Sequence, residues 1–135
     1  MRSKYCRESL SGISIQGGAI GNPNGKSATS LFINGSPFML DNYNVRHTRA
    51  GLVSAVRANT NGDIHLRFFV QTKDNAGWAD GRYAALGIVL DDSNGGDRGM
   101  ALVRRISSVE VKTPQNSPKE PITIIGCRIL PGAET

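Results

Sequence analysis

Apolar residues in this chain occur in short runs, and residues that favour turns separate the runs. Asn, Gly and Pro interrupt the pattern often, and 16 of the 135 residues are glycine. Strand candidates lie at roughly 10–16, 28–33, 37–40, 43–47, 51–58, 63–72, 82–90, 100–112 and 121–130. A turn of helix is expected only near 75–80. We predict an all-β fold, an antiparallel sandwich or barrel of about seven to nine short strands with little or no helix.

The run at 63–72 has the clearest strand pattern, because its apolar residues alternate with other residues. These apolar residues are Ile64, Leu66, Phe68 and Val70. The Asn and Gly residues that precede this run predict a hairpin with the run at 51–58. A three-residue loop at 60–62 would place Leu52 opposite Val70 and keep apolar or small residues opposite each other, so we predict that register.

The other face of this predicted hairpin combines basic and aromatic residues. It carries Arg57, His65, Arg67, Phe69 and Gln71. Such a face can bind nucleic acid by stacking and phosphate attraction, as in OB-folds. It can equally form a protein interface in which an aromatic anchor lies among arginines. A third interpretation places Phe69 in a second buried sheet face, with the arginines at its rim. The sequence leaves these three interpretations open.

The length of 135 residues corresponds to one domain. We expect a single β-domain over 1–135, with polar tails at 1–8 and 131–135 and a proline-rich connection at 112–121. The formal net charge is +5, and the chain has 11 arginines but 5 lysines. Because arginine is enriched and lysine depleted at protein interfaces, this bias favours a protein contact surface over a nucleic-acid surface.

Two segments resemble ligand sites but fail on spacing. Gly25-Lys26-Ser27 ends like a phosphate-binding loop, but the first glycine of that motif would have to stand at position 20, which is Ile20. We predict a plain turn there and no bound nucleotide. The acidic loop at 91–97 lacks the spacing and the closing glutamate of a calcium site, so we expect a solvated loop. No cofactor and no metal site are predicted.

Candidates for catalysis are equally few. The only histidines are His47 and His65, no serine lies in a Gly-x-Ser-x-Gly turn, and no carboxylate pair has apolar surroundings. We expect His47 to be a solvated or interface residue, and we predict no catalytic residue and no enzyme activity. Cys6 and Cys127 lie near opposite ends of the chain. We expect both to be reduced, although a disulfide that ties the termini would also be geometrically allowed.

The sequence contains no apolar stretch long enough to span a membrane and no signal peptide, so we expect synthesis in the cytoplasm. Short strands, polar loops and an arginine-rich surface favour a non-enzymatic structural subunit of a larger assembly. The predicted assembly is a phage or virus particle, in which a capsid, decoration or tail protein acts through contacts between subunits as a homo-oligomer in the virion. The alternative is an OB-like nucleic-acid-binding protein that uses the basic and aromatic face.

The N-terminal tail is too polar to be held by the core of its own domain. Since termini usually fray unless they are tied down, we predict that this tail is an assembly arm that contacts another subunit. Arg2 and Arg7 would meet carboxylates or backbone carbonyls there, and Tyr5 would supply buried area.

Overall fold

The computed structural model describes residues 6–10, 13–18, 42–57, 64–91, 98–113 and 116–130, and of residues 6–10, 57 and 64–66 it describes the backbone alone. The predicted strands at 28–33 and 37–40 lie outside these ranges. So does most of the segment compared above with a phosphate-binding loop.

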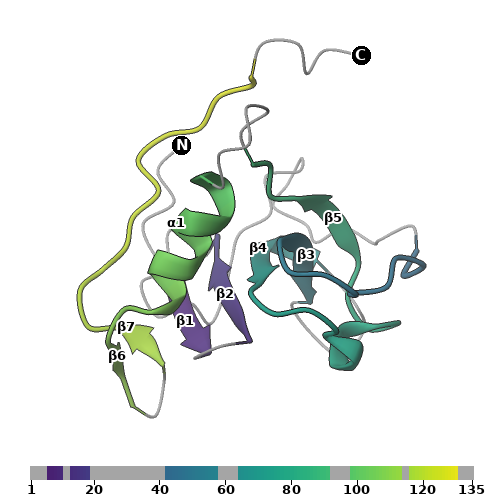
Figure 1. The fold of residues 1–135 in the computed structure, drawn as a ribbon, viewed down its shortest axis with the longest axis horizontal. Helices are drawn as coiled ribbons and strands as arrows, with labels where there is room; N and C mark the ends of the chain where they lie inside the picture. The colour runs from purple at the N-terminus through teal and green to yellow at the C-terminus, as the bar shows by residue number, and fades with distance from the viewer. Residues whose placement is uncertain are drawn as a thin grey trace.

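A five-stranded antiparallel sheet forms the centre of the described structure. Its strands are β1 (Cys6–Leu10), β2 (Ser14–Gly17), β3 (Leu52–Arg57), β4 (Ile64–Gln71) and β5 (Ala85–Ile88), and their order across the sheet is β1-β2-β4-β3-β5. One α-helix, α1 (Arg98–Ser107), lies over β1 and β2 (Figure 1). The fold is thus mostly antiparallel β-sheet with one short helix. A sandwich of seven to nine strands is not established by the described residues.

The short elements outside the sheet occupy two connections. The 3-10 helix η2 (Gly77–Ala79) lies where a single helical turn was predicted, near 75–80. The strands β6 (Val111–Lys112) and β7 (Ser117–Pro118) form a small hairpin within the proline-rich connection. No helix in the described ranges is long and apolar enough to cross a membrane.

The prediction of a strand at 100–112 is wrong, because its N-terminal half is the helix α1. Met100, Val103 and Ile106 follow one another at intervals of three residues, which brings them to one face of a helix. That face packs on the sheet, whereas Leu102 on another side is 55% exposed. Two arginines in the last turn favour the helix further, since cations complement the negative C-terminal end of the helix dipole.

The hydrophobic core lies between α1 and the sheet. Ile15 of β2, Val70 of β4 and Val103 of α1 are buried against one another. The partly buried residues Val53, Phe68, Val89, Met100 and Ile106 pack around them. One face of the sheet is therefore covered by the helix. On β4, Phe68 and Val70 belong to this contact.

The hairpin of β3 and β4 has a register that differs from the predicted one. Val53 lies opposite Val70 and Ser54 opposite Phe69, whereas the pattern predicted Leu52 opposite Val70. An irregularity between Ala55 and Arg57 shifts the register again, so that Arg57 lies opposite Ile64. Because Ser54 lies opposite Phe69, it shares a face with Phe69, on the side of the sheet away from α1.

The C-terminal segment 121–130 was predicted as a strand, and it forms no strand in the described structure. Ile125 is 88% exposed and Ile129 is 81% exposed. Figure 1 shows the segment in yellow, running along the outside of the molecule. Apolar residues create a buried strand only where another strand offers hydrogen bonds and cover, and no described strand pairs with this segment.

The N-terminal segment is also part of the sheet from Cys6 onward. Cys6 pairs with Gly17 and Leu10 with Ser14, so Arg7 belongs to an edge strand and not to a free tail. Arg2 and Tyr5, the other two residues of the predicted assembly arm, lie outside the described residues. Cys127 is a free and exposed cysteine.

Candidate functional site

Three aromatic rings meet on the face of the sheet away from α1. The Phe69 ring on β4 lies 5.6 Å from the Trp78 ring on η2 and 5.2 Å from the Tyr83 ring, between centroids, and the Trp78 and Tyr83 centroids are 5.9 Å apart. Phe69 is 3% exposed, whereas Trp78 is 42% exposed. Edge-on and tilted rings at these separations attract one another. The cluster therefore has a rigid buried base and one large aromatic side chain that reaches solvent.

His47 is buried beneath this cluster. Its ring stacks on Phe69 at 6.1 Å between centroids. Its Nδ1 lies 3.3 Å from Asp80 Oδ1 and its Nε2 lies 2.8 Å from Ser54 Oγ. Because a carboxylate can only accept, Nδ1 carries the hydrogen, and Nε2 accepts from the Ser54 hydroxyl. The expectation of a solvated or interface histidine is wrong, since His47 is 1% exposed.

The backbone around His47 ties its loop to the loop that carries Trp78. His47 N donates to Asp80 Oδ1 at 2.6 Å, and Ala76 N donates to His47 O at 2.8 Å. The buried Gln71 side chain adds a clamp, because its Nε2 donates to His47 O at 3.0 Å and to Lys73 O at 2.6 Å. These bonds explain why the predicted strand at 43–47 is a fixed loop and not a member of the sheet.

The ionisation of the Asp80 carboxylate is altered by its surroundings. The hydrogen bond from His47 N, more than any other influence, holds the pKa of Asp80 below its ordinary value, and the His47 ring and Arg46 act in the same direction. Partial desolvation opposes them. Asp80 therefore stays ionised at neutral pH and serves as a fixed acceptor for the loop.

A small hollow of about 200 Å³ lies beside Trp78. It is lined by Ile13, Lys73, Asp74, Asn75, Ala76 and Trp78. Asn75 at its wall has a φ of 57°, a left-handed conformation that asparagine adopts more readily than most residues. The aromatic cluster and this hollow together form what we call the aromatic site.

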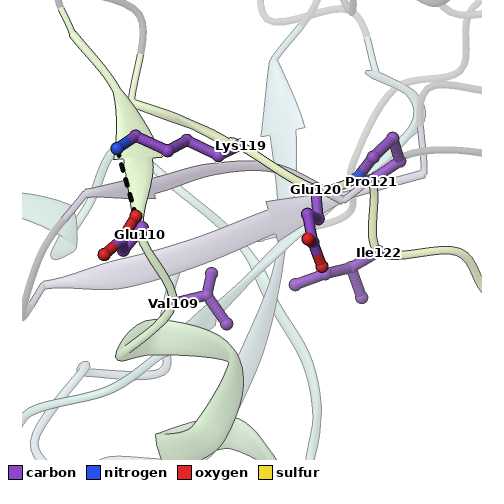
Figure 2. A pocket seen from close by; sticks show the side chains of 6 residues that line it. All are labelled: Val109, Glu110, Lys119, Glu120, Pro121 and Ile122. Carbon is purple, nitrogen blue, oxygen red and sulfur yellow. Dashed lines mark hydrogen bonds and ion pairs between the residues drawn. The ribbon is translucent and has the colours of Figure 1, made fainter.

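A larger hollow of about 500 Å³ is lined by Val109, Glu110, Lys119, Glu120, Pro121 and Ile122. Figure 2 shows the Lys119 ammonium paired with Glu110, at 3.1 Å, and Val109 facing the segment that carries Glu120 and Ile122. No aromatic ring lines it, and its lysine is neutralised by an exposed carboxylate. The smaller hollow beside Trp78 is the better candidate for function, because through Trp78 it adjoins the aromatic cluster.

Of the predicted basic and aromatic face, the side chains of Phe69 and Gln71 are buried. Phe69 is buried in the aromatic site and Gln71 is 0% exposed, so neither is available to a nucleic acid or to another subunit. Arg67 is half-buried, and the side chains of Arg57 and His65 lie outside the described residues. The arrangement corresponds to the third interpretation of the hairpin, in which Phe69 belongs to a second buried face. The physical reason is that the loops 42–50 and 72–84 cover this face.

Sequence reasoning missed Trp78, Tyr83 and the role of His47. One signal for Trp78 was available, because the only tryptophan of the chain lies in the single turn of helix that the sequence predicts. Chemically, the site offers aromatic surface for an apolar ring or side chain of a ligand. Acid–base chemistry is not what His47 is arranged for, since both of its ring nitrogens are engaged by Asp80 and Ser54.

Comparison with known proteins connects this geometry to a family of enzymes. The model of the family described as cyclophilin type peptidyl-prolyl cis-trans isomerase/CLD matches residues 7–129. Peptidyl-prolyl cis-trans isomerase 11 of Caenorhabditis elegans is 33% identical over 115 residues, which are 84% of this chain and 55% of that protein. Peptidyl-prolyl cis-trans isomerase B of Saccharomyces cerevisiae is 30% identical over 115 residues, which are 84% of this chain and 50% of that protein. The chain thus spans about half the length of these relatives.

A solved structure shares the fold. It is the crystal structure of a Cryptosporidium parvum cyclophilin type peptidyl-prolyl cis-trans isomerase in the presence of the dipeptide Ala-Pro. The TM-score is 0.69 at 20% identity, and the superposition covers 90% of this chain and 71% of that chain.

These matches overturn the function predicted from the sequence. The predictions of a non-enzymatic phage or virus subunit and of an OB-like nucleic-acid-binding protein are wrong, because the matching family consists of isomerases. The predicted homo-oligomer of structural subunits and its place in a virion have no support either. The short apolar runs, polar loops and arginines that suggested an assembly are here properties of a β-rich enzyme fold. From Arg7 to Ile129, this chain belongs to the cyclophilin type peptidyl-prolyl cis-trans isomerase/CLD family.

Proposed function

We propose that this chain catalyses the cis–trans isomerisation of X-Pro peptide bonds, and that the aromatic site binds the proline. The observation that carries the proposal is the half-exposed Trp78 against the buried Phe69 and the partly buried Tyr83, in a chain of this isomerase family. Aromatic-lined grooves are a common way to bind proline-containing peptides, because the proline ring is apolar and already fixed in shape.

The isomerisation of a prolyl bond requires no group that makes or breaks a covalent bond. Isomerisation rotates one C–N bond and breaks none, and the barrier of about 18–20 kcal/mol comes from the partial double-bond character of the amide. The planar amide is more charge-separated than the twisted one. A surface that removes water and offers apolar contact therefore disfavours the planar form relative to the twisted form. A free general base is not required, which agrees with a His47 ring that is engaged on both sides.

The relatives support the substrate class. The two curated relatives are named as peptidyl-prolyl isomerases, and the structural relative was crystallised in the presence of Ala-Pro. For the present chain we infer a peptide substrate in which proline follows a small or apolar residue, with the proline ring against Trp78. The neighbouring hollow would receive an adjacent side chain of the peptide.

The test is the exchange rate of an uncharged Ala-Pro peptide, measured by two-dimensional exchange NMR with and without the protein. Uncatalysed exchange takes tens to hundreds of seconds. We expect catalysis by the unmodified chain, and a decrease in kcat/KM of roughly 10- to 100-fold in Trp78→Ala, since a contacting aromatic contributes about 1–3 kcal/mol.

The control is Leu102→Ala on α1, which removes an exposed apolar side chain (55% exposed) outside the aromatic site. It should keep the activity of the unmodified chain. An exchange rate that the unmodified chain does not change would overturn the proposal. Equal losses of activity in the two variants would show that Trp78 is not the binding residue.

A further inference from the structure

The two loops that frame the aromatic site carry more positive than negative charge. Within 42–50 and 72–84 the exposed cations are Arg46, Arg49, Lys73 and Arg82, and the carboxylates are Asp74 and Asp80. Four cations and two carboxylates leave an excess of two positive charges on this surface. We call these four residues the cationic rim.

Both carboxylates already accept hydrogen bonds from the backbone of the fold. Asp80 Oδ1 accepts from His47 N at 2.6 Å, and Asp74 Oδ1 accepts from Ala50 N at 2.8 Å. These bonds fix the carboxylates against the backbone of the neighbouring loop. Lys73, by contrast, forms no ion pair and no side-chain hydrogen bond with any described residue. Its ammonium group is free to meet a ligand.

Three residues of the cationic rim lie beside the aromatic site or the loop that supports it. Lys73 lines the hollow beside Trp78. Arg46 precedes His47 and is close enough to Asp80 to lower the pKa of that carboxyl group. Arg82 precedes Tyr83, whose ring contacts Trp78. A peptide whose proline contacts Trp78 therefore extends over a positively charged surface.

We propose that the aromatic site selects prolyl peptides that carry an acidic residue next to the X-Pro bond, with Lys73 as the nearest contact of that carboxylate. The inference rests on the proposed isomerase function and names the class of substrate that the site prefers. Exposed ion pairs are weak and screened by salt, so the preference is modest, about two- to fivefold in kcat/KM for each change of one charge.

The experiment uses three peptides of the form acetyl-Z-Ala-Pro-Phe-Z-amide, where Z is Glu, Gln or Lys at both positions and the Ala-Pro bond isomerises. Exchange rates give kcat/KM for each peptide, at low ionic strength and in about 0.5 M NaCl. At the higher salt concentration the Debye length is only a few ångströms, so exposed charges are screened. We expect the order Glu above Gln above Lys, and a smaller spread in high salt. The Gln peptide has nearly the same shape as the Glu peptide, so its difference from Glu isolates the charge.

Two variants with the same change in net charge identify the contact. Lys73→Glu should lower the ratio of kcat/KM for the Glu peptide to kcat/KM for the Lys peptide to one or below. Lys112→Glu, an exposed lysine on β6 outside the aromatic site, should leave that ratio unchanged. A ratio that Lys73→Glu does not alter overturns the assignment to Lys73. Catalysis of all three peptides at equal rates overturns the acidic preference but not the isomerase function, and a preference for the Lys peptide would assign the hollow to Asp74 instead. Absence of catalysis on every peptide overturns both proposals.

Discussion

Replacing His47 with alanine should destabilise the protein by about 3–5 kcal/mol, although the residue makes no contact with solvent and contributes no charge to a substrate. The ring is 1% exposed and is held by Ser54, Asp80 and Phe69. Truncation leaves a cavity under Phe69, for which buried large-to-alanine changes indicate about 2–4 kcal/mol. It also leaves the Ser54 hydroxyl, in a residue that is 0% exposed, without its partner.

The hydroxyl provides a way to separate the two contributions. An unsatisfied buried polar group costs about 1–3 kcal/mol. If Ser54 is also changed to alanine, no orphaned hydroxyl remains, and the double variant should be more stable than His47→Ala alone by about 1–2 kcal/mol. The backbone bond from residue 47 to Asp80 survives in each variant, so the loop retains its attachment.

The assay is urea denaturation followed by the fluorescence of Trp78, the only tryptophan, and by circular dichroism. For a chain of this length about 1 kcal/mol corresponds to roughly 3–5 °C in Tm, so His47→Ala should lower the Tm by ~10–20 °C. A loss of stability below ~1 kcal/mol would refute the reasoning, because that size is typical of surface positions. A double variant that is less stable than His47→Ala would show that the Ser54 hydroxyl finds another partner.

Three other changes test separate features of the fold. Asp80→Asn should lower the Tm at neutral pH but lose this effect in acid. The lowered pKa of Asp80 adds stability above the ordinary carboxyl pKa near ~3.9, and this stability disappears as the pH falls through the pKa of the folded state. Equal effects in thermal scans at pH 6 and pH 3 would contradict this. Gly99→Ala should destabilise the protein by about 1–3 kcal/mol in urea titrations despite the higher helix propensity of alanine, since the new Cβ would meet Leu90 O. The control Gly87→Ala meets no atom and should be near neutral. A more stable Gly99→Ala variant would contradict the position of the helix. Ile125→Ser should change stability by no more than ~0.5 kcal/mol in the same titrations, because the side chain is 88% exposed, and a larger loss would mean that the segment is covered in solution.

Local pattern was sufficient for the central hairpin and for the turn beside Trp78. Alternation over 63–72 depends on neighbours two residues apart, so β4 and its partner β3 could be located from the sequence. Their register could not, because it changes at an irregularity between Ala55 and Arg57 that no local pattern in the sequence marks. The helix α1 was missed, although Met100, Val103 and Ile106 lie at intervals of three residues.

The aromatic site shows the same division. Phe69 was selected by the sequence as a notable aromatic residue, but the sequence left open whether its side chain is exposed or buried. Burial depends on the loop around His47, whose carboxylate partner Asp80 is 33 residues away in the chain. No local pattern indicates that these two side chains meet. The isomerase family was likewise found only by comparison, because none of the catalytic motifs sought in the sequence is present.

The sequence by itself determined that this chain is β-rich, basic, rich in turns and provided with strands where apolar residues alternate. Those properties arise from each residue's own backbone preference and from its immediate neighbours. Only the tertiary structure decided that both sides of β4 are covered, that His47 is buried with both nitrogens engaged, and that Trp78 reaches solvent while Phe69 does not. These outcomes depend on contacts between segments far apart in the chain, whose free energies are comparable with local preferences and can therefore override them.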